Sequence, residues 1–130
     1  VIKIFSPADI MTFLTSCVGN ANANGNIRDA YAMVITSQGS YMLQYSGTNS
    51  NFTSLSSSLG NWNNQYKDLF RNALENSDGY LSQSTVENLF LQFLKNNVNI
   101  SGLELYKVDG ITSKKLSLNT NNTTNTTPCP

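Results

Sequence analysis

Few side chains in this sequence have the types and spacings that chemistry requires. The chain contains no histidine, so Ser-His-Asp and Cys-His arrangements and the zinc sites that use histidine are excluded. Its two cysteines are too far apart for a CxxC redox motif and too few for a four-cysteine zinc site. The eight glycines form neither a phosphate-binding loop nor a dinucleotide-binding motif. The sequence therefore predicts no metal and no cofactor.

A pair of carboxylates is the remaining catalytic arrangement to consider, because two such groups can hydrolyse glycosidic bonds. Six of the eight acidic residues are explained by helix caps, solvated helix surface or turns: Asp9, Glu87, Asp68, Glu75, Asp78 and Asp109. Asp29 and Glu104 have no structural assignment, and two unassigned residues are too few to define an active site. We therefore expect a protein that is not an enzyme.

Cys17 and Cys129 are candidates for a disulfide bond that closes nearly the whole chain into one loop. In the chain-entropy model a loop of about 100 residues gives roughly 4–5 kcal/mol of stability. Such a bond would anchor the polar C-terminal segment and would imply an oxidising compartment. The alternative is two unrelated thiols, with Cys17 packed in a helix.

Asparagine, serine and threonine together create five N-x-S/T sequons, which are candidate N-glycosylation sites. They begin at Asn51, Asn99, Asn121, Asn122 and Asn125. Random order of the same residues would give roughly four sequons, so five are not an excess. The sequence therefore leaves glycosylation open.

The chain is poor in charge, with 12% charged residues, eight basic and eight acidic, and its longest run of like charge is Lys114-Lys115. Nucleic-acid binding and polybasic membrane attachment both need clustered lysine and arginine, so neither is predicted. More than a third of the chain is Asn, Ser or Thr, which suits crowded extracellular layers, filaments or virions. The same asparagine content would also follow from an AT-rich genome.

No apolar run approaches the roughly 20 residues that span a bilayer, so no transmembrane segment is predicted. Because the chain begins with Val1 rather than Met, we expect that a leader was removed or that the chain was trimmed. The length of 130 residues fits one domain. An apolar share of 39% is enough for one core.

The N-terminal region carries the clearest local signals. Residues 1–5 (VIKIF) read as a short strand. Ser6 and Asp9 form a capping box around Pro7, which suits the first helical position. Apolar residues then recur at helical spacing, and Gly19 suits the position after a helix end. We expect a helix over 7–18 with Cys17 on its core side.

A hairpin is predicted from two strands, 30–35 and 40–45, that flank Gln38-Gly39. A two-residue turn at Gln38-Gly39 would pair Val34 with Leu43 and Ala32 with Tyr45. Ile35 and Met42 would share the opposite face. Apolar residues on both faces indicate a sheet that is covered on both sides or a surface used for contact.

Two helices are expected over 61–76 and 84–97, the second opened by a capping box from Ser84 to Glu87. Strands over 103–108 and 115–118 follow. The predicted fold is α+β: a mainly antiparallel sheet, made of the N-terminal strand, the central hairpin and one or two C-terminal strands, packed by about three helices. One globular domain would span 1–118, and the Asn/Thr-rich residues 119–130 would form a tail, linker or stalk unless a partner orders them.

Elimination leaves a non-enzymatic secreted or surface-exposed protein that acts through protein–protein contact or self-association, such as a filament, virion or surface-layer subunit. The alternative is a small extracellular module that binds carbohydrate, in which Trp62 and the tyrosines would stack on sugar rings. Core packing is the better explanation for Trp62, Tyr66, Tyr41 and Tyr45, because each lies on an apolar stripe. A small effector or inhibitor is a third interpretation.

Overall fold

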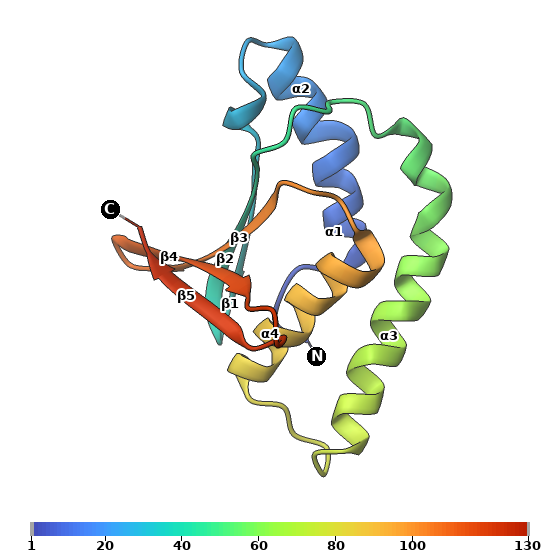
Figure 1. The fold of residues 1–130 in the computed structure, drawn as a ribbon, viewed down its shortest axis with the longest axis vertical. Helices are drawn as coiled ribbons and strands as arrows, with labels where there is room; N and C mark the ends of the chain where they lie inside the picture. The colour runs from blue at the N-terminus through green and yellow to red at the C-terminus, as the bar shows by residue number, and fades with distance from the viewer. Residues whose placement is uncertain (1, 130) are drawn as a thin grey trace.

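The computed structural model describes residues 2–129, which form a five-stranded antiparallel sheet with helices packed on one face (Figure 1). The elements are α1 (Pro7–Thr12), α2 (Val18–Ala23), β1 (Tyr31–Thr36), β2 (Gly39–Tyr45), α3 (Leu59–Glu75), α4 (Gln83–Phe93), β3 (Leu103–Asp109), β4 (Thr112–Leu118) and β5 (Thr124–Pro128). The strands lie in the order β1-β2-β3-β4-β5, so each pairs with its neighbour in sequence. The predicted α+β class is confirmed.

The first helix begins at the predicted capping box. Asp9 N–H donates to Ser6 Oγ over 3.2 Å, and Ser6 N–H donates to Asp9 Oδ2 over 2.8 Å. The helix then runs past its expected end at residue 18, because a π-helical turn over Phe13–Cys17 joins α1 to α2. Gly25, with φ of 129°, follows the helix and allows the chain to reverse.

The expected N-terminal strand is not present in residues 2–5, and Val1 lies outside the described residues. Ile4 and Phe5 instead pack in the core beneath the helices. The Phe5 carbonyl accepts a 2.9 Å hydrogen bond from the Tyr66 hydroxyl of α3. The apolar residues that predicted a strand are buried by tertiary packing instead of strand pairing.

The central hairpin forms with a register shifted by two residues from the prediction. Ser37 and Gln38 make the turn, and Thr36 pairs with Gly39, whose φ of 141° few other residues adopt. Val34 therefore pairs with Tyr41, and Ala32 pairs with Leu43. Because the shift is an even number, every side chain stays on its predicted face.

The predicted pair of helices is present as α3 and α4, connected by a turn through Asp78 and Gly79. The cap of α4 differs from the prediction. Ser82, not Ser84, is the N-cap, and its Oγ accepts from Thr85 N–H over 3.2 Å. A π-helical turn over Leu94–Val98 then continues α4, and Asn99 in the left-handed conformation ends it.

The C-terminal segment, expected to be a tail, linker or stalk unless a partner orders it, contains β5. This strand pairs with β4 after a turn in which Asn119 N–H donates to the Thr123 carbonyl. Threonine favours extended backbone, and an edge strand needs no apolar side chain to pair. Asn88 of α4 donates to the Asn122 carbonyl and to Thr124 Oγ1, which attaches the segment to the helical layer.

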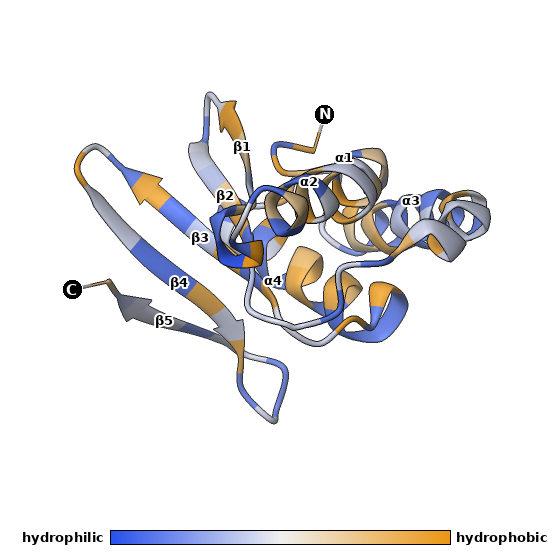
Figure 2. Ribbon diagram, turned by 90° about the horizontal axis from the view of Figure 1, so that it is seen from above, coloured by the Kyte–Doolittle hydropathy of each residue, from blue (hydrophilic) through white to orange (hydrophobic). Residues whose placement is uncertain are grey.

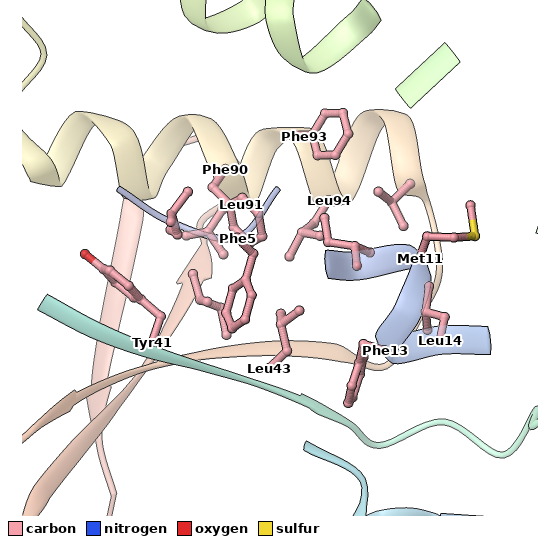
Figure 3. Packing of buried hydrophobic residues seen from close by; sticks show 14 of the residues in the cluster. Phe5, Met11, Phe13, Leu14, Tyr41, Leu43, Phe90, Leu91, Phe93 and Leu94 are labelled. Carbon is pink, nitrogen blue, oxygen red and sulfur yellow. The ribbon is translucent and has the colours of Figure 1, made fainter. Parts of the chain in front are cut away.

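The core lies between the sheet and the helices (Figure 2). One face of the sheet supplies its buried side chains: Tyr41, Leu43, Tyr45, Leu105 and Leu116. Figure 3 shows Tyr41 and Leu43 pointing from β2 toward α4, near Phe90 and Phe5. Among residues 2–129, no helix packs on the other face of the sheet (Figure 2).

Candidate functional site

The uncovered face of the sheet carries large apolar side chains in solvent. On β1 they are Tyr31, Met33 and Ile35, which are 60%, 49% and 80% exposed. They alternate with Ala32 and Val34, which pack against the core. Strand geometry puts alternate residues on opposite faces, so burying one set against the helices leaves the other set in solvent.

Cross-strand pairing places further residues of the neighbouring strands on this same face of the sheet. Met33 pairs with Met42 of β2, Met42 with Tyr106 of β3, and Tyr106 with Lys115 of β4. We call this surface the open-face patch and define it by its eight residues: Tyr31, Met33, Ile35, Met42, Glu104, Tyr106, Val108 and Lys115. Contiguous exposed apolar area of this kind marks contact sites on soluble proteins.

The two charges of the open-face patch neutralise each other. Lys115 Nζ lies 2.9 Å from Glu104 Oε2, and this hydrogen bond raises the pKa of the lysine. The Tyr106 hydroxyl is 3.5 Å from Glu104 Oε1, and burial together with that carboxylate raises the pKa of Tyr106. The open-face patch is thus close to neutral at pH 7.

Sequence reasoning placed Ile35 and Met42 on one face, and the structure confirms it. The β3 members of the patch, Tyr106 and Val108, were missed, because finding them requires the β2–β3 register. Asp29 and Glu104 do not form a carboxylate pair. Glu104 is paired with a lysine, while Asp29 is exposed in the turn before β1.

A second polar cluster lies on the covered side of the sheet, around Glu87 of α4, which is only 7% exposed. Its Oε2 accepts from the Tyr41 hydroxyl over 2.5 Å and from Lys107 Nζ over 2.8 Å. Gln83 donates to the same hydroxyl over 2.9 Å. The prediction that Glu87 is a helix cap is wrong, because the helix is capped two residues earlier, at Ser82, and Glu87 bonds to side chains of the sheet instead.

The Glu87 cluster is fully satisfied. Burial, and then the hydrogen bond to Glu87, raises the pKa of Tyr41, so its hydroxyl stays protonated and donates. Among residues 2–129, every buried side-chain nitrogen and oxygen has a hydrogen-bond partner. A buried carboxylate held this way links α4 to β2 and β3, and it leaves no free base or nucleophile.

The predicted Cys17–Cys129 bond is absent, and both cysteines are free thiols. Cys17 lines a groove beside β1 at one edge of the sheet. Cys129 follows β5 at the other edge, where its N–H donates to the Ser113 carbonyl of β4. The two cysteines therefore lie beside opposite edge strands, which are four strand spacings of about 4.8 Å apart in the order of the sheet, farther than a disulfide reaches.

All five sequon asparagines are exposed: Asn51, Asn99, Asn121, Asn122 and Asn125. Three of them, Asn51, Asn121 and Asn125, form a hydrogen bond with the threonine hydroxyl of their own sequon. Asn51 Oδ1 accepts from Thr53 Oγ1 over 2.9 Å, and Asn121 Oδ1 accepts from Thr123 Oγ1 over 2.6 Å. These side chains are accessible to modification, and glycosylation stays a prediction.

The aromatic side chains divide as the core-packing interpretation predicts. Trp62, Tyr41 and Tyr45 are buried, and Tyr66 packs between α3 and α4, where burial raises its pKa. Residues 2–129 contain no group of three His, Cys, Asp or Glu side chains placed to hold a metal ion. Within the same residues, no helix is both long and apolar enough to cross a membrane.

Comparison of this chain with family models, with curated proteins and with solved structures found no match.

Proposed function

We propose that this protein is a non-enzymatic subunit that acts through protein–protein contact, and that the open-face patch is its contact surface. The observation that carries the proposal is the row of exposed Tyr31, Met33 and Ile35 on a sheet face that no described helix covers. Exposed aromatic and methionine side chains are also the types enriched at protein interfaces.

The size of the surface supports the proposal. At about 200 Å² for each large side chain, the exposed fractions of Tyr31, Met33 and Ile35 amount to roughly 400 Å². One side of a standard interface buries about 800 Å². The three side chains therefore supply about half of such a surface before Met42, Tyr106 and Val108 are added.

The electrostatics indicate the chemistry of the partner. The Glu104–Lys115 pair is internal to the open-face patch, so the surface presents little unbalanced charge. Its partner would be an apolar, nearly neutral protein surface rather than a polyelectrolyte. The low total charge and the abundance of Asn, Ser and Thr favour an extracellular setting or the surface of a cell or virion.

The proposal is tested by placing a charge in the patch. Met42→Lys would put a second ammonium in the patch beside Tyr106 and should weaken capture of a partner protein at least tenfold, because an unpaired charge resists burial. Asn63→Lys, on the exposed side of α3, is the matched control and should associate like the parent. Light scattering over a concentration series measures self-association, and affinity capture measures other partners.

Two outcomes would overturn the proposal. One is a parent protein that stays monomeric at millimolar concentration and captures no partner. The other is equal capture of a partner protein by the Met42→Lys and Asn63→Lys variants, because the contact with that partner would then lie outside the open-face patch.

A carbohydrate-binding module remains the second candidate, and one observation favours it. Tyr31, Gln44 and Glu104 form one cross-strand row on the open face, which places an aromatic ring beside an amide and a carboxylate. Sugars are bound by such combinations of stacking and hydrogen bonding. A glycan array with hits that Tyr31→Ala abolishes would favour this candidate, and an array without hits would remove it.

A further inference from the structure

β1 is an edge strand whose outer backbone groups have no partner among residues 2–129. Thr36 and Gly39 close the two-residue turn, so Thr36, Val34 and Ala32 direct their N–H and C=O groups toward β2. Tyr31, Met33 and Ile35 therefore direct theirs outward. Three residues offer six backbone hydrogen-bonding groups to an added strand.

The sequence of β1 does nothing to prevent strand addition. Residues 31–36 (YAMVIT) contain no charge and no proline, which are the usual means of protecting a sheet edge. The opposite edge differs, because β5 (TNTTP) is entirely polar apart from Pro128. An apolar, uninterrupted edge strand is a template for another strand.

We propose that β1 pairs antiparallel with β1 of a second copy of this chain, about a two-fold axis at Met33. In that register Met33 meets its own counterpart, and Tyr31 meets Ile35 of the second copy. All three outward-facing residues of each strand then find partners, and every opposed side chain on the open face is apolar. The strand is thus complementary to itself, as an isologous dimer requires.

A groove beside the edge has room for the incoming strand. It holds about 200 Å³ between the first helix and β1, lined by Phe5, Asp9, Thr12, Phe13, Cys17 and residues 32–34. In the proposed register Ala32 of the second copy lies opposite Val34, with its side chain on the helical side of the sheet. A small methyl group fits a groove of this volume, and its only charged lining residue, Asp9, is bonded to the backbone of Ser6.

The dimer would extend the proposed function, on which this inference rests. Pairing at β1 joins two sheets into one of ten strands, with the two open-face patches side by side. Met42, Tyr106 and Val108 stay free on the joined surface because they lie on inner strands. The doubled patch would then face a further partner.

Met33→Pro tests the pairing at the backbone, because it removes an outward N–H and leaves the bonds to β2 intact. Met33→Ala is the matched control, since it trims the side chain and keeps the N–H. Light scattering should show dimers for the parent, a dimer weakened by no more than about tenfold for Met33→Ala, and monomers for Met33→Pro. Monomers for both variants, or dimers for both, would contradict backbone pairing.

Amide hydrogen exchange of the unmodified chain provides a second readout that needs no variant. The amides of residues 32, 34 and 36 should be protected at every concentration, because they bond to β2. Those of residues 31, 33 and 35 should become protected only as concentration rises. Cys17 should lose reactivity toward thiol reagents over the same range, with Cys129 as the internal reference.

The two proposals fail in different ways. If Met42→Lys abolishes partner capture while residues 31, 33 and 35 exchange freely at all concentrations, the contact function stands and the β1 dimer is wrong. If the dimer forms through β1 but Met42→Lys changes no association of any kind, the dimer stands and the open-face patch is not the contact surface.

Discussion

One face of the sheet is buried and the other is exposed to solvent, although the strands supply apolar residues to both. On the covered face, Tyr41 and Leu43 point toward α4 (Figure 3), and Leu105, which pairs with Leu43, is buried as well. On the open face, Met33, Met42 and Tyr106 form a row of similar size with no described helix above it. Apolar character alone therefore does not determine burial. What matters is that every helix of the described chain packs on the same side.

The first way to test this contrast is to shorten neighbouring residues on β2. Leu43→Ala leaves a cavity in the core and should lower the free energy of unfolding by about 2–5 kcal/mol. Met42→Ala removes a partly exposed side chain and should cost about 1 kcal/mol or less. Urea unfolding monitored by circular dichroism measures both. Equal losses would mean that the open face is covered in solution.

The second comparison uses the two buried or half-buried carboxylates that pair with lysine. Glu87→Gln leaves the Lys107 ammonium, 35% exposed, and the Tyr41 hydroxyl without their charged acceptor, and should cost about 2–3 kcal/mol. Glu104→Gln breaks the more exposed pair on the open face and should cost less than about 1 kcal/mol. Thermal unfolding at pH 7 separates them, and a reversed order would contradict the structural role given to Glu87.

Alkaline pH should destabilise the fold through two of its tyrosines, Tyr41 and Tyr66. Burial raises the pKa of Tyr41 and of Tyr66, so the folded protein keeps two protons that the unfolded chain releases above about pH 10. Their contribution to stability is complete below pH 10 and is lost as pH rises. Ultraviolet titration should show Tyr41 and Tyr66 ionising only well above pH 10 in the folded protein. Ionisation of Tyr41 and Tyr66 near pH 10, with the protein still folded, would contradict the raised pKa values.

The smallest effect on folding is expected at the most exposed position of the patch. Ile35→Ser should change the free energy of unfolding by no more than about 0.5 kcal/mol, because Ile35 is already in solvent. Denaturant unfolding of dilute protein is the measurement. A loss above about 1 kcal/mol would indicate that something covers Ile35 even at low concentration.

Local signals in the sequence were reliable where the structure is local. The capping box of Ser6 and Asp9 needs only four neighbouring residues. The similar Ser84–Glu87 signature misled, because Ser82 offers a competing cap two residues earlier. The true partner of Glu87 is Lys107, which a different strand brings to it. No local sequence pattern predicts that contact between α4 and β3.

Part of the candidate site could also be predicted, because alternation within a hairpin is a local pattern. Alternation within the hairpin put Ile35 and Met42 on one face, and an even shift in register preserved that result. Adding Tyr106 and Lys115 requires the pairing of strands that are more than 50 residues apart in sequence. The strand in residues 124–128 was missed because the segment has no alternating apolar residues. Backbone pairing at the edge of a sheet does not need them.

The three methionines of the chain allow the central claim to be measured directly. Met33 and Met42 lie in the open-face patch, whereas Met11 belongs to α1 and is buried in the core. In a methyl nuclear magnetic resonance spectrum of methionine-labelled protein, rising concentration or added partner should shift or broaden the signals of Met33 and Met42. The Met11 signal should not change. A spectrum in which association perturbs Met11 and leaves Met33 and Met42 unchanged would contradict the proposal that the open face is the contact surface.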